Sequence, residues 1–362
     1  MKLFSDFASF CLRHERVLSP AVFLGGFIID NLTLTRIDLW VSNAVLFSYL
    51  AIAGTSISLA NYYEGRGAQS RFAARATVVL ELAMQFALGG LFSGYFIYYT
   101  KSASLAVSWP FIAVLLFMLI GNELFKKRYQ RLGFQVGAFF FALFSFMIFF
   151  VPVIVGKMGV LVFLVSGVLS IVGIAAFLAL VALLAPQRIR GGRRTLILVI
   201  GGIYLALNVA YFTNIIPPIP LALKSSGVYQ GVERTATGDY ELSGEQHSFF
   251  DRLKFYEEVH LTPGERVYAY SAVFAPTKLS TSVVHRWQYY NEGKRQWVTS
   301  TEVSFPVAGG RDGGYRGFSY KDAVFPGKWR VEVMTPQGQV LGQVQFVVFY
   351  VDTPPVLITT VG

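Results

Sequence analysis

The stretch from Gly159 to Ala185, GVLVFLVSGVLSIVGIAAFLALVALLA, runs for 27 residues without a charged side chain. A helix rises about 1.5 Å per residue, and about 20 apolar residues cross a bilayer core roughly 30 Å thick. This stretch is therefore long enough to span a membrane. Similar stretches recur before and after it, and together they predict seven spans: 17–34, 39–60, 74–98, 105–123, 133–155, 159–185 and 195–214.

The composition agrees with a membrane protein. Hydrophobic residues make up 54% of the 362 residues, charged residues only 14%, and the mean hydropathy is +0.51. Soluble globular proteins carry about 25% charged residues, so a fully soluble chain is disfavoured. The single cysteine, Cys11, excludes a disulfide framework and a cysteine-rich metal site.

Basic residues are distributed unevenly between the two sides of the predicted bundle. Fourteen lie in the N-terminal segment and the even-numbered loops, and three lie in the other loops. Because Lys and Arg are enriched in cytoplasmic loops, the N-terminus is predicted to be cytoplasmic, and seven spans place the residues after Asn214 outside. The first span leads into a second one without a cleavage site, which predicts a retained anchor. The basic residues are interpreted as topology signals facing anionic lipid, with no nucleic-acid partner.

The residues after the last predicted span change in character. Residues 215–262 are predicted to be an interfacial, proline-rich linker and irregular segment, with a short helix near 249–259. Further on, apolar and polar residues alternate, as in 329–334, which is typical of half-buried strands. We therefore expect residues 1–214 to form a membrane all-α bundle of seven transmembrane helices. Residues 263–362 are expected to form an all-β, antiparallel, immunoglobulin-like sandwich.

Three motifs resemble a family of bacterial envelope domains of unknown function: Val284-His285-Arg286-Trp287, the glycine-rich run Gly309–Gly317 and Pro326–Val331. The resemblance covers about residues 262–350. The first half is similar to the membrane region that often precedes this domain, including Gly25–Phe27 and Asp30–Thr33. The resemblance implies a Gram-negative inner-membrane protein with a periplasmic C-terminal domain. It implies neither an activity nor a catalytic residue.

Asp30, Arg36 and Asp38 flank the first predicted outer loop. Acidic residues near hydrocarbon are costly and often functional, which makes this trio a candidate ion or headgroup site. The alternative is an arginine paired locally with carboxylates that order a short turn.

Glu81 is predicted to lie well inside the third span, on a face that also carries Gln85. A carboxylate at this depth should be neutral or hydrogen-bonded, and Asn208 of the last span is a candidate partner. The functional interpretation is movement of a proton or cation. The alternative is a hydrogen bond that holds helices together.

The glycine-rich run Gly309–Gly317 provides a second group of candidate binding residues. Its glycines permit a close backbone approach, its basic side chains suit phosphate or carboxylate, and its aromatic rings suit sugars. The predicted contact residues for a glycan, lipid headgroup or protein partner are Arg311, Asp312, Tyr315, Arg316, Tyr320 and Lys321. The alternative is a structural hairpin.

Other candidate chemistry is sparse. Trp287, Trp297 and Trp329 are expected in the core more than in a sugar platform. The histidines show no zinc spacing, and no nucleophile elbow or phosphate loop occurs, so neither metal nor cofactor is expected.

These observations favour a non-enzymatic inner-membrane accessory, scaffold or sensor protein. Its partners would be membrane lipid, a membrane or periplasmic protein, and an envelope glycan or lipid headgroup. The alternative functions are a transporter or lipid-handling protein that uses Glu81, Asp30 and Asp38, and a membrane enzyme at the outer face. A catalytic constellation is missing from the motifs, so the enzyme ranks last.

Overall fold

A computed structural model describes residues 27–34, 36–65, 71–102, 104–124, 131–236, 238–245, 256–311, 313–322 and 324–362. The chain divides into two compact units. The first holds residues 1–98, 113–148 and 166–206, which include most of the helical residues, and the second holds 99–112, 149–165 and 207–362, which include all the labelled strands.

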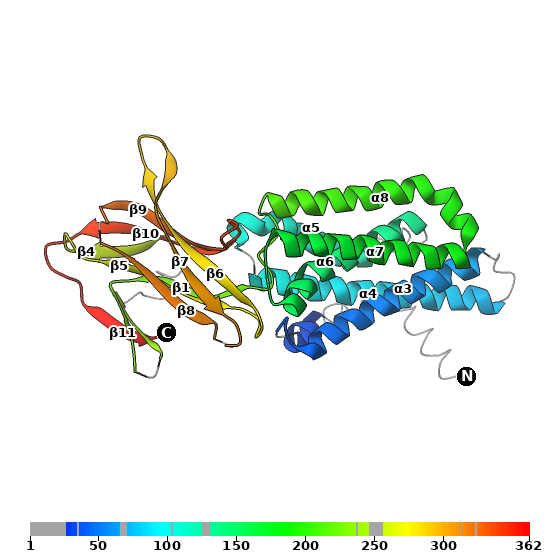
Figure 1. The fold of residues 1–362 in the computed structure, drawn as a ribbon, viewed down its shortest axis with the longest axis horizontal. Coiled ribbons are helices and arrows are strands. Elements are labelled where there is room, and N and C mark those ends of the chain that lie inside the picture. The colour runs from blue at the N-terminus through cyan, green and yellow to red at the C-terminus, as the bar shows by residue number, and fades with distance from the viewer. Residues whose placement is uncertain are drawn as a thin grey trace. The chain divides into compact units, whose positions relative to one another are not determined.

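Six long helices follow a short helical segment at residues 27–33. Their bounds are α3 Trp40–Gly65, α4 Arg71–Ser102, α5 Leu105–Leu124, α6 Leu132–Val155, α7 Val160–Leu184 and α8 Pro186–Phe212. They run side by side in Figure 1. Among the described residues, five of them are long and apolar enough to cross a membrane: α3, α4, α6, α7 and α8.

The predicted count of seven spans is therefore not supported. The apolar part of α5, Val107–Asn122, has only 16 residues, or about 24 Å of helix. Most of the first predicted span, 17–34, falls outside the described residues.

Helix α6 lies at the centre of the bundle and is the most buried of the candidate spans. It binds its neighbours through a few polar contacts in an otherwise apolar environment. Asn61 of α3 donates to the Gln135 side chain over 2.7 Å, and the Tyr95 hydroxyl of α4 donates to the Ala142 carbonyl over 2.9 Å. Small residues let the helices approach, since a Cβ on Gly54 would lie 3.3 Å from the Phe139 ring.

Eleven labelled strands follow α8. Their bounds are β1 Ala222–Tyr229, β2 Gly231–Arg234, β3 Tyr240–Glu245, β4 Glu257–Leu261, β5 Val267–Phe274, β6 Ser280–Asn291, β7 Gln296–Ala308, β8 Tyr315–Lys321, β9 Gly327–Met334, β10 Val340–Tyr350 and β11 Leu357–Val361. They form three sheets of order β1-β5-β8, β4-β10-β9-β6-β7 and β11-β3-β2.

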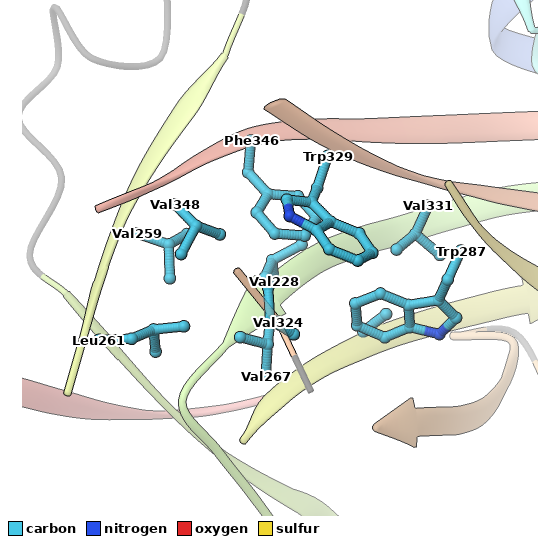
Figure 2. Packing of buried hydrophobic residues seen from close by; sticks show 11 residues of the cluster. Val228, Val259, Leu261, Val267, Trp287, Val324, Trp329, Val331, Phe346 and Val348 are labelled. Atoms are coloured by element: carbon cyan, nitrogen blue, oxygen red, sulfur yellow. The ribbon is translucent and has the colours of Figure 1, made fainter. Parts of the chain in front are cut away.

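The first two sheets share one hydrophobic core, which Figure 2 shows. Val228 and Val267 come from the three-stranded sheet, and Trp287, Trp329 and Phe346 come from the five-stranded sheet. The three aromatic side chains have no exposed surface. Period-2 alternation along β6, β9 and β10 directs these three aromatic side chains inward, as the sequence pattern predicts.

The strand arrangement differs from the prediction in two respects. Strands β1 to β4 occupy residues 222–261, where irregular structure was predicted; the helix predicted near 249–259 falls mostly outside the described residues, but 257–261 form β4. Strand β4 also pairs parallel with β10, with Val259 opposite Val348, so the sheet is not wholly antiparallel. Short strands such as β2 carry too few residues to show a periodicity.

We predict that Gly309→Ala destabilises the β region. A Cβ at this position would lie 1.7 Å from the Pro276 carbonyl oxygen, so the backbone must move. Overpacking of this kind costs about 1–3 kcal/mol. Urea unfolding of the full chain in detergent, followed by near-UV circular dichroism, measures the change.

Gly313→Ala is the matched control, because a Cβ there would meet only the Arg316 side chain, at 3.9 Å. Equal stability of the two variants would contradict the prediction.

Candidate functional site

The residues predicted from the glycine-rich run do not form one cluster. Tyr315 and Lys321 lie at opposite ends of β8, about 20 Å apart at the rise of a strand. Tyr315 packs against the core, and the Lys321 ammonium donates to Thr301 Oγ1 over 2.9 Å. Arg311 is exposed in a turn, and Asp312 lies outside the described residues.

Arg316 and Tyr320 lie instead along a row of aromatic rings. The row, here called the aromatic face, consists of Tyr240, Tyr268, Tyr270, Phe318 and Tyr320. Ring centroids of successive neighbours are 5.8–6.1 Å apart. Val232 and Leu242, from β2 and β3, pack on one end of this face and bury Tyr270.

The other end of the aromatic face is open. Tyr320 is 49% exposed and contacts Tyr268 at 5.8 Å. The Arg266 guanidinium lies 5.0 Å from the Tyr320 ring centroid and donates to Asp322 Oδ1 over 2.5 Å. This hydrogen bond raises the pKa of Arg266, whose guanidinium is charged at neutral pH in any case. An exposed ring beside a fixed cation is suited to stacking on a ligand.

An ion pair lies at the covered end of the aromatic face. Arg316 Nη1 lies 2.6 Å from Asp239 Oδ1, which ties β8 to the segment between β2 and β3. Burial is the main cause that raises the pKa of Tyr270 beside this pair. The sequence analysis missed Arg266, Tyr268 and Asp239. The alternation of Tyr268 and Tyr270 along β5 was the available signal, because period 2 puts both rings on one face.

The outer face of the five-stranded sheet carries a ladder of charges. Arg286 pairs with Glu302 at 2.6 Å and with Glu332 at 3.7 Å, and Arg330 pairs with Glu332 at 3.2 Å. The strand register places these residues opposite one another on β7, β6 and β9. Cross-strand pairs of opposite charge stabilise a sheet and leave little net charge for a ligand.

Two of the three tryptophans are core residues, as expected. Trp287 and Trp329 have no exposed surface. Trp297 differs, because it lies on the charged outer face, with its ring 5.4 Å from that of Tyr290 and the Arg330 guanidinium 4.6 Å from its centroid.

A buried histidine links the two sheets. The His285 ring of β6 makes hydrogen bonds of 2.8 Å with Ser271 Oγ and 2.9 Å with Ser319 Oγ. Trp287 Nε1 donates to the same Ser319 oxygen over 2.9 Å. All four side chains are buried, which excludes substrate from this Ser–His arrangement. Burial lowers the pKa of His285 to about 4.

Arg36 and Asp38 form a two-point ion pair. Arg36 Nε lies 3.0 Å from Asp38 Oδ1, and Nη2 lies 2.7 Å from Oδ2. The Tyr98 hydroxyl donates to the Arg36 carbonyl over 3.3 Å. Asp30 is half-buried in the helical segment 27–33, where its carbonyl accepts from the Leu34 amide.

Glu81 and Gln85 lie one turn apart on α4, and both are half-buried. The polar side chain next to Gln85 is Asn122 of α5, which donates to the Gln85 carbonyl over 3.0 Å. Gly89 makes room for this amide, because a Cβ there would lie 2.9 Å from Asn122 Nδ2. Asn208 is half-buried on α8.

Within the described part of the chain, no group of three or more His, Cys, Asp and Glu side chains could hold a metal ion. His260 is half-exposed and paired with Glu245 at 2.7 Å, while His247 lies outside the described residues.

Comparison with known families gives one match. Residues 280–348 match a family described as a protein of unknown function (DUF2914). The match spans β6 to β10, the strands that contain His285 and the ladder, and fits the unknown-function C-terminal domain that the sequence resembles. It covers about a fifth of the chain.

No curated protein matches the chain. Among solved structures, the Pseudomonas fluorescens alkylpurine DNA glycosylase AlkC bound to DNA containing an abasic site analog is 10% identical, over 87% of this chain and 99% of that one. Its TM-score of 0.23 is too low to support any statement about fold or function.

We predict that acid destabilises the β region through His285. Its pKa is about 4 when folded and about 6.5 when unfolded, so the stability present above pH 6.5 is lost as the pH falls toward 4. The slope should approach about 1.4 kcal/mol per pH unit. Urea unfolding of the full chain at several pH values measures it.

The His285→Gln variant should show a flatter pH dependence than the wild-type chain. A wild-type slope in His285→Gln would contradict the assignment.

Proposed function

We propose that this protein is a membrane-anchored, non-enzymatic accessory protein whose β region binds an envelope component, either a protein or a glycan. The observation that carries the proposal is the open end of the aromatic face. There the exposed Tyr320 ring of β8 meets the Tyr268 ring of β5 and the guanidinium of Arg266, the residue just before β5. Aromatic rings and arginine are enriched where proteins bind partners, and such rings also stack on sugars.

Burial argues against a hydrolytic function for the β region. In the described part of the chain, His285 contacts two serines, Ser271 and Ser319, and all three side chains are buried. Most charged side chains of the outer ladder are engaged with one another. A binding role therefore accounts for the exposed chemistry better than catalysis does.

In this proposal the helical region anchors the protein in a bacterial inner membrane. The β region is an immunoglobulin-like domain in the periplasm. The support is the apolar length of five helices and the run of arginines at the start of α8, Arg188, Arg190, Arg193 and Arg194, which favours the cytoplasmic side. In this topology Arg190 faces the cytoplasm and Lys294 the periplasm.

Transport or lipid handling through Glu81, Asp30 and Asp38 is the second candidate. The half-burial of Glu81 on an apolar helix favours it. The ion pair that holds Asp38 on Arg36 weighs against an open site at that end.

The topology is tested by cysteine labelling, which the single native cysteine makes simple. In a Cys11→Ser background, Lys294→Cys should react with a membrane-impermeant maleimide on intact spheroplasts. Arg190→Cys should react only after permeabilisation. Both positions are exposed, so accessibility reports the side of the membrane. The reverse pattern would refute the predicted orientation.

Partner binding is tested with a photo-crosslinking amino acid at position 320 of the full chain in its native membranes. We expect one dominant adduct, because position 320 is at the open end of the aromatic face. Mass spectrometry identifies the adduct as protein or glycan.

Position 294, exposed on a hairpin turn, is the control and should give no dominant adduct. The same adducts at both positions, or none at either, would contradict the proposed binding surface.

A further inference from the structure

A groove of about 780 Å³ lies between α5, α6 and α8, away from every candidate discussed above. Its lining is apolar apart from Arg131 and Thr195. All lining residues belong to the first compact unit. The groove therefore combines an extended apolar surface with one cation.

Two glycines bring α6 and α8 together along one side of the groove. A Cβ on Gly133 would lie 3.1 Å from Thr195 Cγ2, and a Cβ on Gly137 would lie 2.8 Å from Val199 Cγ1. Glycines four residues apart on one helix face allow this close approach. The contact fixes the distance between the two helices, so that the groove is a feature of the backbone packing.

The length of the groove corresponds to one leaflet of a bilayer. Its α6 wall extends from Arg131 to Phe141, ten residues, or about 15 Å of helix. The hydrocarbon core of a bilayer is roughly 30 Å thick, so one leaflet is about half of that. Away from Arg131 the lining is apolar, with side chains such as Phe141 and Ile203, and an acyl chain is the molecule that fits an apolar slot of this depth.

The charge of the groove lies at one end. Arg131 is exposed one residue before α6 begins. Thr195, which meets Gly133 across the groove, follows the exposed Arg193 and Arg194 on α8. A guanidinium offers a planar set of donors to phosphate oxygens. A cation at the mouth of a leaflet-deep apolar groove is complementary to an anionic phospholipid.

We propose that this groove binds one acyl chain of an anionic glycerophospholipid, with Arg131 bound to the phosphate at the cytoplasmic surface. The inference rests on the membrane placement of the proposed function. It does not depend on the aromatic face or on its partner.

Lipid selectivity tests the proposal. The full chain is reconstituted with equimolar phosphatidylglycerol and phosphatidylcholine of identical acyl chains, and bound lipids are counted by native mass spectrometry. Wild type should retain phosphatidylglycerol about fivefold over phosphatidylcholine, the ratio expected for one basic residue near the surface. Arg131→Gln should abolish the preference. Arg190→Gln, an exposed arginine outside the groove lining, should retain it.

A second pair of variants tests the groove itself. Val114 lines the groove and is 45% exposed, so Val114→Trp should fill the space and reduce both lipid adducts. Leu116, 41% exposed on the same helix, does not line the groove, and Leu116→Trp should leave the adducts unchanged. Far-UV circular dichroism checks that each variant is folded.

Three results would overturn the proposal. The first is equal retention of the two lipids by wild type, and the second is an equal loss of the lipid preference in Arg131→Gln and Arg190→Gln. The third is a wild-type dimer without bound lipid that dissociates in Val114→Trp, which would show that a second copy of the chain occupies the groove. Carbonate extraction separates this failure from failure of the proposed function. A chain that stays in the membrane but shows no lipid preference refutes only the groove.

Discussion

The β region depends on a network of hydrogen-bonded side chains that connects its two sheets through the core. His285 of β6 bonds to Ser271 of β5 and to Ser319 of β8, and Ser319 also accepts from Trp287. Each of these polar groups would cost about 1–3 kcal/mol if it were left buried without a partner. The network therefore favours the alignment of the two sheets in which these side chains face inward, and that alignment determines which side chains point outward.

The two outer surfaces follow from this alignment. With Trp287 directed inward, period 2 sends Arg286 outward into the charged ladder. With Ser319 directed inward, Phe318 and Tyr320 point outward onto the aromatic face. Both surfaces pair their charges, since Arg266 is bound to Asp322. The aromatic face differs in that it leaves the Tyr320 ring 49% exposed beside that pair. Recognition is thus more readily assigned to the aromatic face than to the ladder.

Much of the architecture could be predicted from the sequence, because long apolar runs and period-2 alternation are local signals. Trp287 and Trp329 were correctly expected in the core. Strands β1 to β4 were not expected. Strands β2, β3 and β4 have only four to six residues, and β1, with eight, does not alternate between apolar and polar side chains. The glycine-rich run was interpreted as one site, but β8 is extended and separates Tyr315 from Lys321. Arg266 and Tyr320 meet through the pairing of β5 with β8, which no local spacing reveals.

Glycine has the same physical role in the helices and in the strands. Gly309 lets one backbone approach another at the Pro276 carbonyl, and Gly133 and Gly137 let α6 approach α8. At Gly309, the residue after β7, the space beside the glycine is filled by the Pro276 backbone. In the helices the same approach leaves a groove beside the contact, with Arg131 at its mouth. A glycine therefore points to a ligand site only where the space beside it stays open and the residues that line this space match the chemistry of an available molecule.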